Sequence, residues 1–163
     1  MQLTALAVAL SVALTWPLAL DPFTQALDGP YWGSFAWSIE AFSEAVWSGR
    51  SWTETRAAGF PMVHEARYLG GVVLLAGVVL QPLLGAPATM NLALMAGPVL
   101  SAVCMGLWLR QMLPQAQTTA WMLASLGYAF SPHFVANLSN AEVAKAQFWL
   151  VPLSLLLAGR AGP

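Results

Sequence analysis

The residues of this sequence that can do chemistry are few and lie in two short polar stretches. Asp28 belongs to the first, directly before Gly29-Pro30. A carboxylate held at such a rigid turn can bind a metal ion or take a proton from an incoming hydroxyl group, a role worth about 10²–10⁴ in rate. The alternative is that Asp28 only caps a helix whose first turn contains Pro30.

Two basic side chains close the first stretch. His64 and Arg67 follow Gly59-Phe60-Pro61. An arginine or histidine beside a pocket can neutralise a phosphate group, although single residues of this kind are more often solvated loop charges. Zinc is not expected, because His64 and His133 are the only histidines and the single cysteine, Cys104, is far from both in sequence.

The second polar stretch separates two apolar runs near the end of the chain. It contains His133, Asn137 and Glu142, with Lys145 just beyond. Polar residues between apolar spans usually line a cavity or a water-facing loop. Glu142 is the only acidic residue after Glu65, which makes it the second candidate carboxylate. The alternative is a loop carboxylate that pairs with Lys145.

The composition predicts an integral membrane protein. Of the 163 residues, 58% are hydrophobic and 8% are charged, and the mean hydropathy is +0.66. A soluble domain has about 25% charged residues. The net charge is −1 and no Lys/Arg cluster is present, so nucleic acid is excluded as a partner. We expect a multi-pass protein of the cell inner (cytoplasmic) membrane, with lipid around it.

The apolar runs predict an all-α membrane domain over residues 1–163, with four to five transmembrane or re-entrant helices. The runs 3–20 and 90–112 are close to or above the ~20 residues needed to cross a bilayer. The run 69–85 is either a short span or a re-entrant segment. The chain stops soon after its last run, so we expect it to be a fragment of a longer protein. The predicted segments are 3–20, 69–85, 90–112, 118–134 and 146–159.

The outer loop over residues 21–68 is predicted to contain an amphipathic helix. Its apolar side chains recur at helical spacing, whereas Glu40 and Glu44 fall on another side. With tryptophans beside the apolar face, the helix is expected to lie in the membrane interface. The apolar positions are Trp32, Phe35, Ile39, Phe42 and Val46.

The topology depends on the segment 69–85. If it is re-entrant, Arg110 and Arg160 are both cytoplasmic, as positively charged residues at span ends tend to be. The loop with Asp28 and the loop with Glu142 then share the outer side. If 69–85 crosses fully, Arg110 and the later polar loop exchange sides.

The order of these features resembles the start of bacterial polytopic GT-C-type membrane glycosyltransferases, over nearly the whole chain. The resemblance combines an apolar first span, an aspartate at the head of an outer amphipathic helix, and several short motifs. The matching residues are Trp16-Pro17-Leu18, Asp28, Pro82-Leu-Leu-Gly85, Asn91-Leu92, Leu109-Arg110, Tyr128-Ala-Phe-Ser-Pro132 and Trp149-Leu-Val-Pro-Leu153.

The resemblance implies a transferase that takes a sugar from a polyprenyl-phosphate donor at the outer face of the membrane. It implies that Asp28, the catalytic candidate, activates the acceptor or binds a divalent metal ion. Gly29 stands where the family has a second carboxylate. Candidate substrate-binding residues are His64, Arg67, His133, Asn137 and Glu142. The alternative function is a non-catalytic membrane subunit or assembly factor that docks a protein partner through the Trp-rich helix.

Overall fold

The chain folds mainly into α-helices, as the apolar periodicity predicts. A computed structural model describes residues 1–16, 18–25, 32–51, 54–55, 64–65, 71–140 and 147–160. The elements are α1 (Gln2–Leu14), the 3₁₀ helix η1 (Leu18–Leu20), α2 (Trp32–Trp47), β1 (Glu54–Thr55), β2 (His64–Glu65), α3 (Gly71–Leu84), α4 (Ala86–Met112), α5 (Thr118–Ala129), α6 (Pro132–Ser139) and α7 (Leu150–Arg160). The strands, which the sequence did not predict, form one antiparallel pair.

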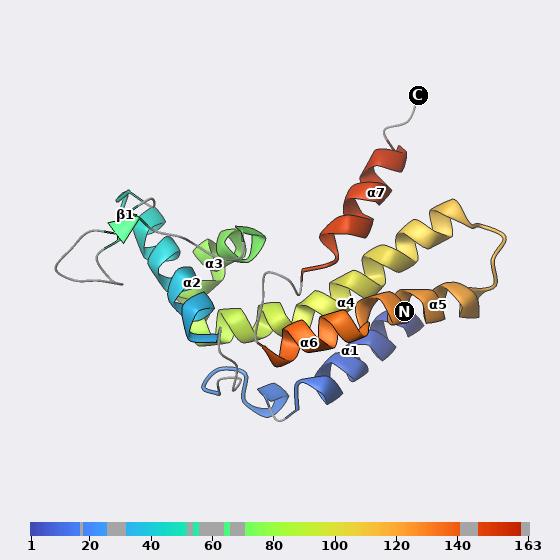
Figure 1. Cartoon of the computed structure of the whole chain (residues 1–163), viewed down its shortest axis with the longest axis horizontal. Helices are drawn as coiled ribbons and strands as arrows, with labels where there is room; N and C mark the ends of the chain where they lie inside the picture. The colour runs from blue at the N-terminus through green and yellow to red at the C-terminus, as the bar shows by residue number, and fades with distance from the viewer. Residues whose placement is uncertain are drawn as a thin grey trace.

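The long helix α4 is the axis of the fold (Figure 1). Its 27 residues extend about 40 Å at 1.5 Å per residue. Helices α1, α5 and α7 pack against it, and α2 and α3 pack against each other and against its first half. Within the described ranges, α4 is the one helix both long and apolar enough to cross a bilayer, and α1, α3 and α7 are apolar but shorter.

The two ends of α4 are marked by different neighbours. The hydroxyl of Ser11 in α1 donates to the Met95 carbonyl oxygen, 2.6 Å away, and Leu3 lies against Gly106. Helix α1 therefore runs antiparallel to α4. Asn91 and Arg110 then mark opposite ends of the molecule, and we call these the Asn91 end and the Arg110 end.

Proline and glycine set several helix boundaries that differ from the predicted ones. The first run, predicted over 3–20, is helical only to Leu14, because Pro17 has no amide hydrogen to continue the helix and disfavours helical geometry before it. Helix α4 begins at Ala86 and not at Met90, since a proline suits the first helical turn. Gly85 separates α3 from α4 with φ of +81°, a conformation that favours glycine.

The segment predicted as one helix over 118–134 is two helices. Proline at position 132 was expected to kink or end it, and α5 does end at Ala129. The same proline then starts α6, because its fixed φ suits the first helical position. Asn137, expected in a polar loop, therefore lies within a helix. The last helix, predicted over 146–159, begins at Leu150.

Helix α2 is amphipathic as predicted, but its apolar face has a different neighbour. Phe35 and Ile39 are buried, and Glu40 and Glu44 are exposed. Phe35, Ile39 and Phe42 of the face predicted to meet the bilayer instead pack in a core with α3, α4 and Phe134 of α6, whereas Val46 is exposed. Gly77 of α3 permits this contact, because a Cβ there would lie 2.9 Å from a methyl carbon of Ile39.

Candidate functional site

The structure describes the side chains of two of the six predicted site residues. His133 and Asn137 both lie on α6. The backbone of His64 lies in β2 and pairs with Thr55 of β1, and the structure does not describe the His64 side chain. Outside the described residues altogether are Asp28, Arg67 and Glu142.

His133 presents an exposed imidazole at the Asn91 end. Its ring stacks on Phe148, with 5.2 Å between ring centroids and 29° between planes. Phe134, the next residue, is fully buried in the core that α2 and α4 share. The buried phenyl ring anchors this turn of α6, and the exposed imidazole remains able to donate or accept a hydrogen bond.

Asn137 has a local structural role in the helix. Its side chain is 6% exposed, and Nδ2 donates to the His133 carbonyl oxygen at 2.8 Å. This bond fixes the amide against the preceding turn of α6. The structure therefore separates the two residues: His133 faces outward, whereas Asn137 supports the backbone of His133.

The clearest positioning group at this end is Asn91, which the sequence indicated only as part of a motif. Its side chain is fully buried in α4. Nδ2 donates to the carbonyl oxygens of Pro22 and Gln25, at 2.8 and 2.7 Å. In the sequence, the signal that could have indicated this role was an amide side chain within an apolar run. These bonds hold against α4 the segment that ends three residues before Asp28 in the sequence.

A second segment is tied to α4 close to the same place. Gln147 donates from Nε2 to the Ala93 carbonyl oxygen at 3.3 Å and accepts from Trp149 Nε1 at 2.5 Å. Tyr128 of α5 donates its hydroxyl to the Phe148 carbonyl oxygen at 2.9 Å. This segment begins five residues after Glu142 in the sequence. The segment that ends three residues before Asp28 and the segment that begins five residues after Glu142 are thus both anchored within one turn of α4.

Asp21 forms a compact turn within the first anchored segment. The Thr24 hydroxyl donates to its carboxylate, and the Thr24 amide donates to Oδ1 at 3.3 Å. The hydroxyl bond is the main reason that the pKa of Asp21 lies below its ordinary value. The turn gains stability from this bond above the ordinary pKa and loses it as the pH falls through the lowered pKa.

Replacing Thr24 with valine is expected to raise the pKa of Asp21 toward its ordinary value. Valine keeps the branched shape but removes the hydroxyl donor that favours the ionised carboxylate. An NMR titration of the carboxyl carbon of Asp21 measures the shift. Thr118→Val, at the other end of α4, is the control and should leave this titration unchanged. An unaltered Asp21 titration in Thr24→Val would contradict the assigned cause.

The described side chains also bear on whether the chain binds a metal ion. Among the residues with described side chains, no three histidine, cysteine, aspartate or glutamate side chains gather into a group that could hold a metal ion. The metal predicted for Asp28 remains a prediction.

Comparisons of the chain with known protein families, curated proteins and solved structures find no match.

Proposed function

We propose that this chain is part of a membrane glycosyltransferase of the GT-C type, which takes a sugar from a polyprenyl-phosphate donor. The proposal rests on the resemblance described above and on the construction of the Asn91 end. That end combines an exposed imidazole with two anchored segments, and these segments approach both candidate carboxylates in the sequence.

The same proposal places the chain in the cell inner membrane as a multi-pass protein. The length of α4 and its mean hydropathy of 1.9 over 18 residues support this membrane location. The shorter apolar helices α1 and α7 pack alongside α4, so they could share the bilayer with it. In this orientation the Asn91 end faces outward, and Arg110 faces the cytoplasm, as positively charged residues near span ends do.

Each candidate residue has a proposed role. Asp28 takes the proton of the acceptor hydroxyl or holds a divalent metal ion. His64, Arg67 and His133 contact the donor phosphate, because cationic and imidazole groups donate to phosphate oxygens. Glu142 binds the sugar or the acceptor, and Asn137 positions the backbone of His133.

The observation that carries the proposal is the pair of side-chain amides, of buried Asn91 and half-buried Gln147, whose hydrogen bonds hold two segments within one turn of α4. Asn91 holds the Pro22–Gln25 segment, and Gln147 is bonded to Ala93, two residues further along α4. Burying amides in an apolar core costs free energy unless their hydrogen bonds are made. Such anchors are expected where loops must be held in a defined geometry, as they must in an active site.

Photo-crosslinking tests the proposed donor. The purified chain is irradiated with a photoactivatable polyprenyl phosphate, and the labelled peptides are identified by mass spectrometry. Label is expected in the peptide that contains His133 and should be lost on competition with undecaprenyl phosphate. Undecaprenol, which lacks the phosphate, is the control competitor and should compete weakly. Labelling that undecaprenol suppresses equally well would contradict phosphate recognition at this end.

The alternative function, a subunit that docks a protein through the Trp-rich helix, has less surface than the sequence suggested. Phe35 and Ile39 are buried within the chain, so they are not free to bind a partner. Val46 and Trp47 remain 43% and 67% exposed at the end of α2. Absence of any phosphate-dependent crosslink, with co-purification of a protein through this end of α2, would favour the subunit.

A further inference from the structure

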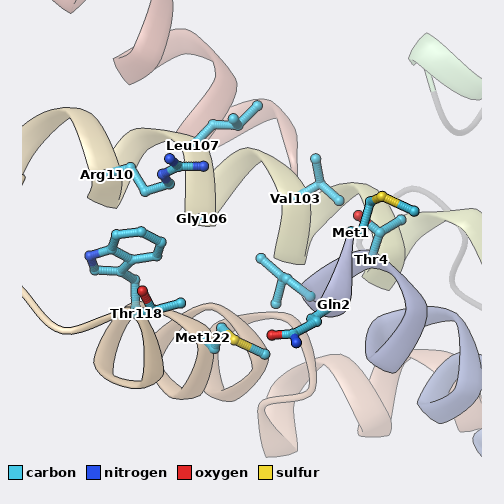
Figure 2. Close-up of a pocket in the computed structure, with 11 residues that line it drawn as sticks. Met1, Gln2, Thr4, Val103, Gly106, Leu107, Arg110, Thr118 and Met122 are labelled. Atoms are coloured by element: carbon cyan, nitrogen blue, oxygen red, sulfur yellow. The ribbon is translucent and has the colours of Figure 1, made fainter.

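A cavity lies at the Arg110 end of α4, the opposite end from His133 (Figure 1). Its volume is about 340 Å³, and it forms where the start of α1, the end of α4 and the start of α5 meet. Figure 2 shows Arg110 on α4 across from Thr118 and Met122 on α5. His133 and Asn137, the predicted site residues whose side chains the structure describes, do not line this cavity.

Two hydrogen-bond donors, the exposed guanidinium of Arg110 and the buried Nε1 of Trp121, belong to residues that line the cavity, and neither has an acceptor among the described residues. The guanidinium carbon of Arg110 lies 4.9 Å from the centre of the Trp121 ring. In the described ranges, the one ion pair joins Arg50 to Glu44, so no described carboxylate neutralises Arg110. Trp121 Nε1 is buried and has no hydrogen-bond partner in this part of the chain. A buried N–H of this kind costs free energy that a bound acceptor would recover.

The helix ends around the cavity add to its affinity for a negative charge. Helices α1 and α5 both begin here, and neither has a side-chain cap or an acidic residue in its first turn. The first amides of a helix have no partner within it and carry partial positive charge. Arg110 and these helix starts line the same cavity, so its electrostatics favour an anion.

The other walls of the cavity are apolar. Leu3, Val103, Leu107 and Met122 contribute them, and the described part of the chain adds no aspartate or glutamate to the lining. A volume of about 340 Å³ far exceeds that of a phosphate ion alone. A ligand that combines an anionic group with a hydrocarbon chain matches both kinds of wall.

We propose that this cavity binds the phosphate group of a phospholipid, with Arg110 and Trp121 Nε1 as donors to the phosphate oxygens and the first part of an acyl chain against the apolar wall. Arginine suits this role because its planar guanidinium can donate two hydrogen bonds to one phosphate. The inference concerns the Arg110 end and does not depend on the proposed sugar transfer.

Binding to the purified chain in a neutral detergent tests the cavity. The probes are dioctanoyl phosphatidylglycerol, dioctanoylglycerol without the phosphate, and inorganic phosphate, each followed by its effect on the thermal midpoint and by titration. The phospholipid is expected to raise the midpoint, and dioctanoylglycerol is not. If inorganic phosphate raises the midpoint less than the phospholipid does, the result supports a phospholipid as the ligand. If both raise the midpoint equally, the site binds free phosphate and the phospholipid proposal is wrong.

Variants connect the binding to the named donors. Arg110→Gln is expected to weaken phosphatidylglycerol binding at least about tenfold, since a hydrogen bond from a charged group is lost. Arg110→Lys should recover part of the affinity, and Trp121→Phe, which keeps an aromatic ring, should lose several-fold. Arg50→Gln removes the same charge far from the cavity and should bind as the parent does.

Three results would overturn the proposal. The first is phosphatidylglycerol binding that is equally tight in Arg110→Gln and in Arg50→Gln. The second is binding of dioctanoylglycerol as tight as that of phosphatidylglycerol. The third is phosphatidylglycerol binding that is unchanged in both Trp121→Phe and Arg110→Gln. Melting curves without ligand identify a variant that fails to fold, and Trp121→Phe and Arg110→Lys then carry the comparison. Crosslinking of polyprenyl phosphate near His133 is measured separately, so failure of either proposal leaves the other testable.

Discussion

Replacing Asp28 with asparagine is expected to abolish sugar transfer while the protein still inserts and folds. Asparagine keeps the size of the side chain but can neither take a proton from the acceptor nor hold a metal ion as a carboxylate does. The expected loss is about 10²-fold or more, the usual contribution of a general base. The measurement is transfer of radiolabelled sugar from a polyprenyl-phosphate donor in membranes that contain the protein.

The control for this variant is Asp21→Asn. Asp21 lies seven residues earlier, and its carboxylate is bound by Thr24 within its own turn. Its replacement removes the same charge from the same loop and is expected to change transfer only a few-fold. Unchanged transfer in Asp28→Asn would remove the proposed base, and an equal loss in both variants would indicate a general effect of loop charge.

Replacing Asn91 with leucine is expected to destabilise the protein by about 1–3 kcal/mol, because the carbonyl oxygens of Pro22 and Gln25 lose their donor. Asn91→Asp is expected to cost more still. Aspartate has the same shape, but both of its oxygens are acceptors when ionised, and they would face the Pro22 and Gln25 carbonyl oxygens. Unfolding of the detergent-solubilised protein measures both changes.

The two Asn91 variants should also reduce transfer more than stability alone explains. The amide holds the segment that leads to Asp28, so loss of the anchor is expected to reduce transfer even at temperatures where the variants remain folded. Ser101→Ala is the matched control, because its buried hydroxyl donates only to Gly97 within α4. Asn91→Leu that is as stable and as active as Ser101→Ala would contradict the anchoring role.

The helices were largely predictable because their signals are local. Apolar spacing identified α2 and placed Glu40 and Glu44 on its exposed side, as observed. Pro132 marked the end of α5, again as predicted. Each of these features depends on residues within a few turns of one another, so the chain carries the information without reference to its neighbours.

The partners of each face were not predictable in the same way. The apolar face of α2 packs on α3 and α4, although its composition fits a bilayer equally well. An apolar side chain is stabilised by any apolar surface, since the hydrophobic effect has no direction. The choice among surfaces depends on close approaches such as that of Ile39 to Gly77, which arise only when distant segments meet.

The candidate site likewise has features that the sequence predicts and features that only packing determines. The residue types alone predicted Asp28, His64, Arg67, His133, Asn137 and Glu142 as candidate site residues, and these remain predictions. The apolar composition of the chain was also evident from the sequence.

Packing assigned the roles of Asn91 and Trp121, whose types and neighbours in sequence look ordinary. Asn91 became an anchor because the Pro22–Gln25 segment returns to α4. Trp121 came to lie beside Arg110 because α5 packs on α4, and its buried Nε1 has no acceptor among the residues that the structure describes. Hydrogen bonds require short distances and defined angles, so only the folded chain brings these groups within range of one another.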